Sequence, residues 1–253
     1  MVRKAIQKAV GKAVGKAIKL GAPLLIAVLS AMGPRADAAD ADSAKVFPNP
    51  RTMEVARVVA QGRGAQVEAL VRAGADLADR GQGDLTLLQW AMLRGEARML
   101  GLLLDLGADP LQPGYGGGTA LHMAAQARKK PYLKILLDHG ADPNVRDGRT
   151  GAPVLSEAVM SRNHDAVKLL LQRRADPNAT SRQNETPLHA AALISDYESM
   201  LLLLEAGADP SIRNTAGHTF APYFAIHPKE SMMSREARSA RAAVQAWLGS
   251  HGY

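Results

Sequence analysis

The chain has 253 residues, of which 47% are hydrophobic, and this composition excludes a disordered chain. It contains no cysteine, which excludes a disulfide scaffold, a thiolate metal site and a cysteine nucleophile. The formal net charge is +7, but seven of the 31 basic residues and one of the 24 acidic residues lie in residues 1–38. The remaining 24 basic and 23 acidic residues nearly cancel, so the charge does not predict nucleic-acid binding.

The N-terminal segment has the layout of a secretory signal peptide. Residues 3–21 are basic, residues 22–32 form a short apolar run, and Ala36 and Ala38 supply the small residues that a signal peptidase requires. The run is shorter than the ~20 residues that span a bilayer. We predict a signal peptide over residues 1–38, cleaved near Ala38, a linker over residues 39–50, and a periplasmic or secreted protein. The alternative is an anchor at the inner-membrane surface, because lysines at four-residue spacing predict an amphipathic helix.

A four-residue motif, Gly-Ala-Asp-Pro, recurs along the rest of the chain. Its copies, of which the first and the fourth are imperfect, begin at Gly74, Gly107, Gly140, Arg174 and Gly207. The intervals between them are 33, 33, 34 and 33 residues, and the extra residue of the third interval lies within residues 146–152. A fixed period of this length indicates stacked supersecondary repeats.

A threonine motif follows this four-residue motif at a constant distance. Twelve residues after four of the copies stand Thr86, Thr119, Thr186 and Thr219. At residues 186–191 the motif reads Thr-Pro-Leu-His-Ala-Ala, which within a 33-residue period resembles the ankyrin repeat. The resemblance covers residues 51–227 and implies an all-α solenoid of stacked helix-turn-helix repeats with β-turn fingers. We expect Thr86, Thr119 and Thr186 to cap the first helices of their repeats. The glycines that begin the Gly-Ala-Asp-Pro copies are expected to end the second helices.

The period predicts six repeats and a closing helix. They cover residues 51–82, 83–115, 116–149, 150–182, 183–215 and 216–227, and the closing helix covers residues 228–253. We expect an irregular fourth repeat, because Arg174 replaces the terminal glycine and Ser156 the motif histidine. We expect a delayed or distorted first helix in the sixth repeat, because Pro222 stands at the histidine position. The arginines of the closing helix are expected to face water: Arg235, Arg238 and Arg241.

The sequence indicates no catalytic chemistry. His122 and His189 are the obvious candidates, but the resemblance assigns them a structural role, hydrogen bonding between neighbouring repeats. The other histidines lack metal-ligand spacing, and the glycine-rich residues 114–118 lack the lysine of a phosphate-binding loop. We therefore expect no enzyme, no catalytic residue, no cofactor, no metal and no small-molecule substrate.

A protein partner is the expected ligand. The resemblance implies docking on the concave side, which is made of finger tips and first helices, whereas Trp90 is expected to be packed. Arginine and tyrosine are enriched in interface hot spots, and an exposed Leu193-Ile194 pair would be costly without a partner. The predicted partner-binding residues are Arg80, Gln82, Leu93, Arg94, Tyr115, Gln126, Arg146, Arg149, Met160, Arg182, Glu185, Leu193, Ile194 and Arg213. The arginines predict a partner with an acidic surface, bound by a monomer that contacts a membrane only through its N-terminal segment.

These features predict a non-catalytic protein-binding module in the bacterial periplasm. The resemblance to exported bacterial ankyrin proteins implies two roles: an immunity or inhibitor-like protein that blocks a toxin, which we favour, or an accessory to stress resistance. The alternatives are a secreted effector that binds host proteins and a scaffold anchored at a membrane surface.

Overall fold

The computed structural model describes residues 46–225 and 233–253, and these belong to two compact units. The first compact unit comprises residues 46–149, and the second comprises residues 150–225 and 233–253. The predicted signal peptide, most of the predicted linker and residues 228–232 of the predicted closing segment lie outside the described residues. Within the described residues the structure has 12 α-helices and no strands, which confirms the predicted all-α repeat fold.

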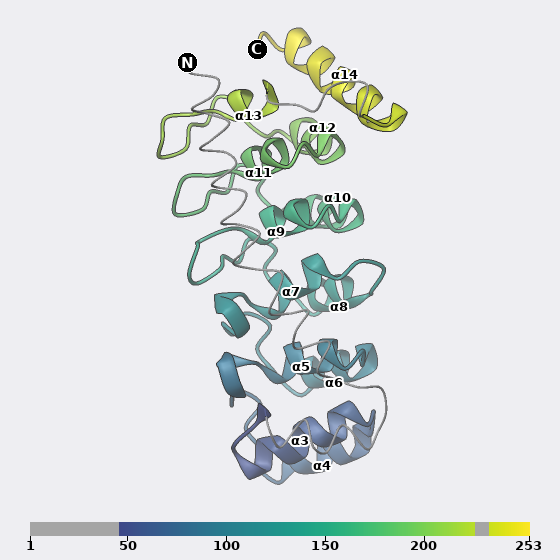
Figure 1. Cartoon of the computed structure of the whole chain (residues 1–253). Coiled ribbons are helices and arrows are strands. Elements are labelled where there is room, and N and C mark those ends of the chain that lie inside the picture. The colour runs from purple at the N-terminus through teal and green to yellow at the C-terminus, as the bar shows by residue number, and fades with distance from the viewer. Residues whose placement is uncertain (1–45, 226–232) are drawn as a thin grey trace. The chain divides into compact units, whose positions relative to one another are not determined.

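The first compact unit consists of three pairs of short helices (Figure 1). The pairs are α3 (Pro50–Ala60) with α4 (Gly64–Arg72), α5 (Leu87–Leu93) with α6 (Ala97–Asp105), and α7 (Ala120–Gln126) with α8 (Tyr132–Asp138). The two helices of each pair contact each other, α5 contacts both α3 and α7, and α6 contacts α8. The connections between pairs are fingers that carry the 3-10 turns η1 (Gln82–Asp84) and η2 (Tyr115–Gly117), which also contact each other.

The second compact unit continues the same pattern to the C-terminus. Its helices are α9 (Val154–Met160), α10 (His164–Gln172), α11 (Pro187–Leu193), α12 (Tyr197–Glu205), α13 (Ala221–Ala225) and α14 (Arg235–Ser250). Helix α11 contacts α9 and α13, and α12 contacts α10 on one side and α14 on the other. Helix α14 therefore covers a face of α12 that would otherwise be exposed (Figure 1).

Side-chain caps start the first helices at Thr86, Thr119 and Thr186, as predicted. The backbone N–H of Gln89 donates to Thr86 Oγ1 (3.2 Å), and Thr86 N–H donates in return to Gln89 Oε1 (3.2 Å). Thr186 and His189 form the same reciprocal pair at the start of α11. Each pair satisfies backbone donors that have no partner within the helix.

Left-handed residues end the second helices. Gly107 and Gly207 have φ angles of 93° and 91°, values that glycine adopts without steric cost. Arg174 adopts the same conformation with φ 64°. The hydrogen bond that follows it, from Ala175 N–H to Leu170 O (2.9 Å), matches that from Ala108 N–H to Leu103 O (2.9 Å). The predicted irregularity is therefore wrong for the end of the fourth repeat, where Arg174 adopts the left-handed conformation. It holds at the start of the repeat, where the N-cap of α9 is Pro153 and makes no side-chain cap.

The C-terminal end confirms one prediction and corrects another. Helix α13 begins at Ala221, two residues after Thr219, whereas α11 begins directly after Thr186, so the first helix of the sixth repeat is delayed as predicted. In α14, Arg235 and Arg238 are exposed, but Arg241 is half-buried with its guanidinium 5.7 Å from the centre of the Phe224 ring. The expectation that Arg241 faces water is wrong, because it covers an aromatic side chain of the last repeat.

The core lies between successive helix pairs within each compact unit. Leu100 and Leu103 of α6 are fully buried, as are Leu170 of α10 and Leu203 of α12. Trp90 is also fully buried, as expected, and its Nε1–H donates to Ala56 O (2.8 Å) in the preceding repeat. Among the residues that the structure describes, no helix is both long and apolar enough to cross a membrane.

Candidate protein-binding surface

Four of the fingers are tight loops that close just before the next first helix. A backbone N–H donates across the loop to the carbonyl of the residue before the helix cap, from Gly81 to Leu85, Gly114 to Gly118, Ser181 to Glu185 and Asn214 to His218 (2.8–2.9 Å). The residue two positions before the cap has a positive φ in these fingers, as at Asp84 (62°), Gly117 (87°) and Asn184 (57°). This loop geometry turns the residue four positions before the cap towards the neighbouring finger.

Four of the predicted contact residues occupy that position: Gln82, Tyr115, Arg149 and Arg182. The last three each lie across a glycine of the preceding finger. A methyl group placed on Gly83 would lie 3.4 Å from Tyr115 Cδ2. One on Gly117 would lie 2.7 Å from Arg149 Cγ, and one on Gly151 would lie 2.9 Å from Arg182 Cγ. The glycines thus provide space for the side chain of the next repeat. Backbone hydrogen bonds join the same fingers, from Gly148 to Gly117 (2.8 Å) and from Arg182 to Thr150 (2.9 Å).

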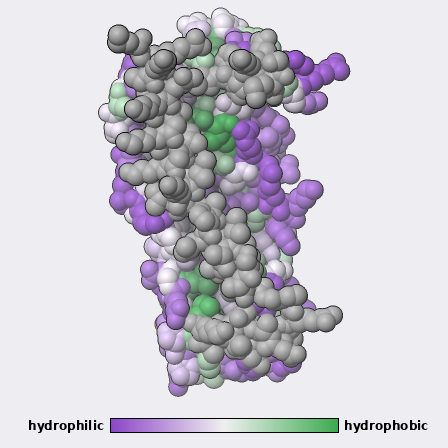
Figure 2. Space-filling model, viewed as in Figure 1, coloured by the Kyte–Doolittle hydropathy of each residue, from purple (hydrophilic) through white to green (hydrophobic). Residues whose placement is uncertain are grey.

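None of the predicted contact residues is buried. The exposed ones are Arg80, Gln82, Gln126, Arg146, Arg149, Met160, Arg182 and Arg213, and the half-buried ones are Leu93, Arg94, Tyr115, Glu185, Leu193 and Ile194. The first compact unit holds the residues up to Arg149, and the second holds the others. Figure 2 shows that the described surface on one face is mostly hydrophilic, with small hydrophobic areas. The role of the fourteen predicted contact residues in binding a partner stays a prediction.

Several of these side chains are held by neighbours within their own compact unit. Arg80 lies 3.8 Å from the Asp84 carboxylate, and Arg213 Nη1 donates to Gly217 O (2.8 Å) in its own finger. Arg94 lies over the Trp90 ring at 5.6 Å from its centre. Such contacts reduce the side-chain entropy that a binding event would have to remove.

Glu185 takes part in a polar network between neighbouring repeats. Its Oε1 accepts a hydrogen bond from Asn214 Nδ2 (2.8 Å), and the same amide lies 3.0 Å from the Tyr223 hydroxyl. Burial raises the pKa of Tyr223 above its usual value, the Asn214 hydrogen bond lowers it, and the nearby Glu185 charge raises it again. The carboxylate of Glu185 therefore has a structural partner in the finger of the next repeat.

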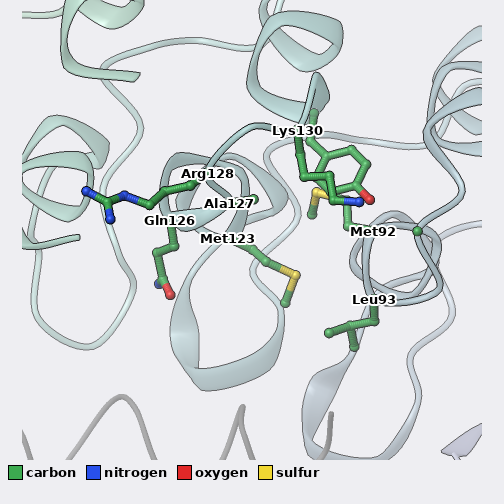
Figure 3. Close-up of a pocket in the computed structure, with 9 residues that line it drawn as sticks. Met92, Leu93, Met123, Gln126, Ala127, Arg128 and Lys130 are labelled. Atoms are coloured by element: carbon green, nitrogen blue, oxygen red, sulfur yellow. The ribbon is translucent and has the colours of Figure 1, made fainter. Parts of the chain in front are cut away.

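The first compact unit contains an apolar pocket that includes two of the predicted residues, Leu93 and Gln126. The pocket has a volume of about 490 Å³ and lies where α5 and α7 end and α8 begins. Figure 3 shows Met123 and Leu93 pointing towards each other across it, with Met92 and Lys130 alongside and Arg128 pointing away. The methionines and Lys130 were not predicted as contact residues. The adjacent run Arg128-Lys129-Lys130-Pro131 is the only signal in the sequence, and it does not indicate a hollow.

Of the two candidate catalytic histidines, His189 makes the hydrogen bond between neighbouring repeats that the resemblance implies, and His122 contacts the cap of its own helix. His189 Nδ1 lies 2.8 Å from Thr186 Oγ1, and its Nε2 lies 3.0 Å from His218 O in the next finger. His122 Nδ1 lies 3.1 Å from Thr119 Oγ1. Within residues 46–225 and 233–253, no three or more His, Asp or Glu side chains come together in an arrangement that could hold a metal ion.

Paired helices, capped starts and interlocking fingers define a helical repeat protein of the ankyrin type. The family model described as ankyrin repeats in three copies matches residues 54–147, and that described as ankyrin repeats in many copies matches residues 155–204. The chain belongs to the ankyrin repeat family. Repeats of this family form a scaffold for protein–protein interaction.

A solved structure supports the same assignment. The chain is similar to the ankyrin repeat domain of Bcl-3, described as a unique member of the IkappaB protein family. The two are 25% identical, the match covers 88% of this chain and 97% of that chain, and the TM-score is 0.66. No curated protein sequence matches the chain.

Proposed function

We propose that this protein is a non-catalytic binding protein of the bacterial periplasm that holds a protein partner with an acidic surface. The role that we favour is that of an immunity or inhibitor-like protein that occludes a toxin by stoichiometric contact. The layout of residues 1–38 supports export, and the arginines of the fingers support an acidic partner.

The observation that carries this proposal is the packing of Arg149 and Arg182 on glycines of the preceding fingers. The aliphatic part of each side chain lies against Gly117 or Gly151, while the residue as a whole stays exposed. A guanidinium held in this way loses less entropy when it pairs with a carboxylate than one on a free side chain. Arginine is also the basic residue best suited to bidentate pairing with carboxylates.

Affinity capture from the native cell envelope tests the proposal. The full chain, tagged at its C-terminus, should recover a protein partner, and the triple variant Arg146→Ala, Arg149→Ala, Arg182→Ala should lose it. The matched control replaces three exposed arginines on helices or their caps, Arg63, Arg98 and Arg235, and should retain the partner. Both triple variants should keep the thermal unfolding midpoint of the wild type. Capture that survives the finger substitutions would refute this contact surface.

Export and the immunity role need separate measurements. N-terminal sequencing of the protein from the periplasm should give a start at Ala39, and a start at Met1 would contradict cleavage. Deletion of the gene should sensitise cells to a toxin that the protein binds. Unchanged sensitivity would remove the immunity role while leaving the binding function intact.

A further inference from the structure

The loop between α7 and α8 differs from the other connections within helix pairs. It comprises residues 127–131, whereas the connections in the other pairs comprise residues 61–63, 94–96, 161–163 and 194–196. Pro131 explains the difference, because a proline disfavours the helical conformation of the residue before it and so delays the start of α8 to Tyr132. The loop turns at Lys129, a residue other than glycine with φ 56°.

This longer loop places basic side chains at the rim of the apolar pocket. Lys130 lines the pocket beside Met92, Leu93 and Met123, and Lys129 is its exposed neighbour in the loop. Neither lysine has an ion pair with any described residue. The carboxylate of Glu96 approaches Gly62 of the preceding repeat, since its Oε2 would lie 3.4 Å from a methyl group there, and its charge also raises the pKa of Tyr132 in the pocket wall. The rim is therefore positive, and its ammonium groups have no internal carboxylate.

The walls indicate what kind of group the pocket receives. Met92 is only 6% exposed, whereas Met123 and Leu93 are half-buried and face the hollow (Figure 3). Methionine side chains adapt to different apolar shapes and are used at binding surfaces for that reason. Sites for small molecules combine an apolar cavity with a few convergent buried polar groups. Here Tyr132 is the one buried polar side chain among the lining residues, and the charged groups of the lysines stand at the exposed rim, which suits a chain that lies across the pocket.

We propose that this pocket receives a large aliphatic side chain of the protein partner, from a segment in which acidic residues flank that side chain. The aliphatic group fills the space between Met123 and Leu93, and the flanking carboxylates pair with Lys129 and Lys130. This inference rests on the proposed function, and it specifies the chemistry of one contact. A volume of about 490 Å³ accommodates a leucine or methionine side chain with part of its backbone.

Methyl NMR on the full chain tests the pocket without a known partner. The protein is labelled with ¹³C at its methionine methyl groups, and Met92 and Met123 are assigned by single substitution to leucine. The probe is a capped pentapeptide with leucine between two pairs of aspartates. One control peptide replaces the leucine by serine, and another replaces the aspartates by asparagine. The first peptide should shift the two methyl signals in a saturable way, and each control should bind at least tenfold more weakly.

Two double variants distinguish the contribution of Lys129 and Lys130 to peptide affinity from the effect of the overall charge of the protein. Lys129→Glu with Lys130→Glu should weaken the leucine peptide at least tenfold. Arg63→Glu with Arg98→Glu makes the same change of charge at exposed positions of the same compact unit and should change the affinity less than twofold. An unchanged peptide affinity in the lysine variant would overturn the inference. The absence of any methyl shift at millimolar peptide would overturn it as well. A tighter response to decanoate than to the peptide would overturn it too, because it would identify an acyl chain as the occupant.

The captured partner distinguishes this inference from the proposed function. One result is that the finger variant loses the partner while the Met123→Lys variant and the Lys129→Glu, Lys130→Glu variant both retain it. This result would refute the proposed pocket contact and leave the proposed binding function unaffected. If no partner is captured at all, the proposed function is refuted, and the peptide titration still tests whether the pocket binds an aliphatic side chain flanked by carboxylates.

Discussion

The Nε2 atom of His189 lies 3.0 Å from the carbonyl oxygen of His218, which closes the next finger along the chain. Its Nδ1 lies 2.8 Å from Thr186 Oγ1, so one imidazole joins the start of a helix to the finger of the following repeat. Gln89 does the same in the first compact unit, where Nε2 donates to Gly118 O (3.2 Å) and Oε1 accepts from Thr86 N–H (3.2 Å). An amide therefore replaces an imidazole without loss of either contact.

Substitution of His189 tests this equivalence. His189→Ala leaves the buried N–H of Thr186 without its partner and removes a hydrogen bond to His218 O, so it should lower the free energy of unfolding by about 1–3 kcal/mol. His189→Gln should recover most of that loss, because Gln89 already makes both contacts at the equivalent position. Urea unfolding followed by circular dichroism measures the difference. Equal destabilisation by both variants would contradict the shared role.

Arg174 should be a position where glycine stabilises the protein. Its φ of 64° is strained for a residue with a side chain, and glycine relieves a cost of roughly 1–2 kcal/mol that is partly offset by greater freedom in the unfolded chain. We expect Arg174→Gly to raise the free energy of unfolding by about 0.5–1 kcal/mol. The reverse change, Gly140→Arg, should lower it by a similar amount. The idea fails if Arg174→Gly destabilises the fold.

Alanine at Gly151 should cost more than alanine at Gly217. Both glycines occupy the same finger position in the second compact unit, with φ 67° and 78°, so both variants carry the same backbone strain of roughly 1–2 kcal/mol. A methyl group on Gly151 meets Arg182 Cγ at 2.9 Å and Arg182 N at 3.2 Å, whereas one on Gly217 meets nothing within 4 Å. Thermal unfolding should therefore show a lower midpoint for Gly151→Ala than for Gly217→Ala. Matching midpoints would mean that Arg182 is not held by this contact.

Tyr132 should make the fold sensitive to alkali. Burial raises the pKa of this phenol above its usual 10.0, and the charge of Glu96 raises it further. A group whose pKa is raised in the folded state contributes stability below its unfolded pKa, and this contribution is lost as the pH rises through the folded pKa. The urea midpoint should thus fall more steeply above pH 10 for the wild type than for Tyr132→Phe, with the two similar near pH 7. An equal fall of the urea midpoint above pH 10 in the wild type and in Tyr132→Phe would contradict this prediction.

The sequence predicted most of the fold because its signals are local and recur. Threonine caps, terminal glycines and a 33-residue period are visible without a partner segment, and the structure places helix starts and ends at these residues. The delay of α13 by Pro222 was predictable for the same reason. The misjudged residues, Arg174 and Arg241, are those whose conformation depends on neighbours. The stack imposes a left-handed angle on the first, and Phe224 covers the guanidinium of the second.

The sequence by itself determined that this chain is a stack of capped helix pairs with arginine-bearing fingers and that its residue types favour a protein partner. Only the tertiary structure decided how those side chains are held and where the surface is hollow. Arg149 lies on Gly117, and Met123 faces Leu93, because stacking brings together residues about one repeat apart in the chain. A local pattern specifies each helix and turn, but the space left between two repeats depends on side chains from both.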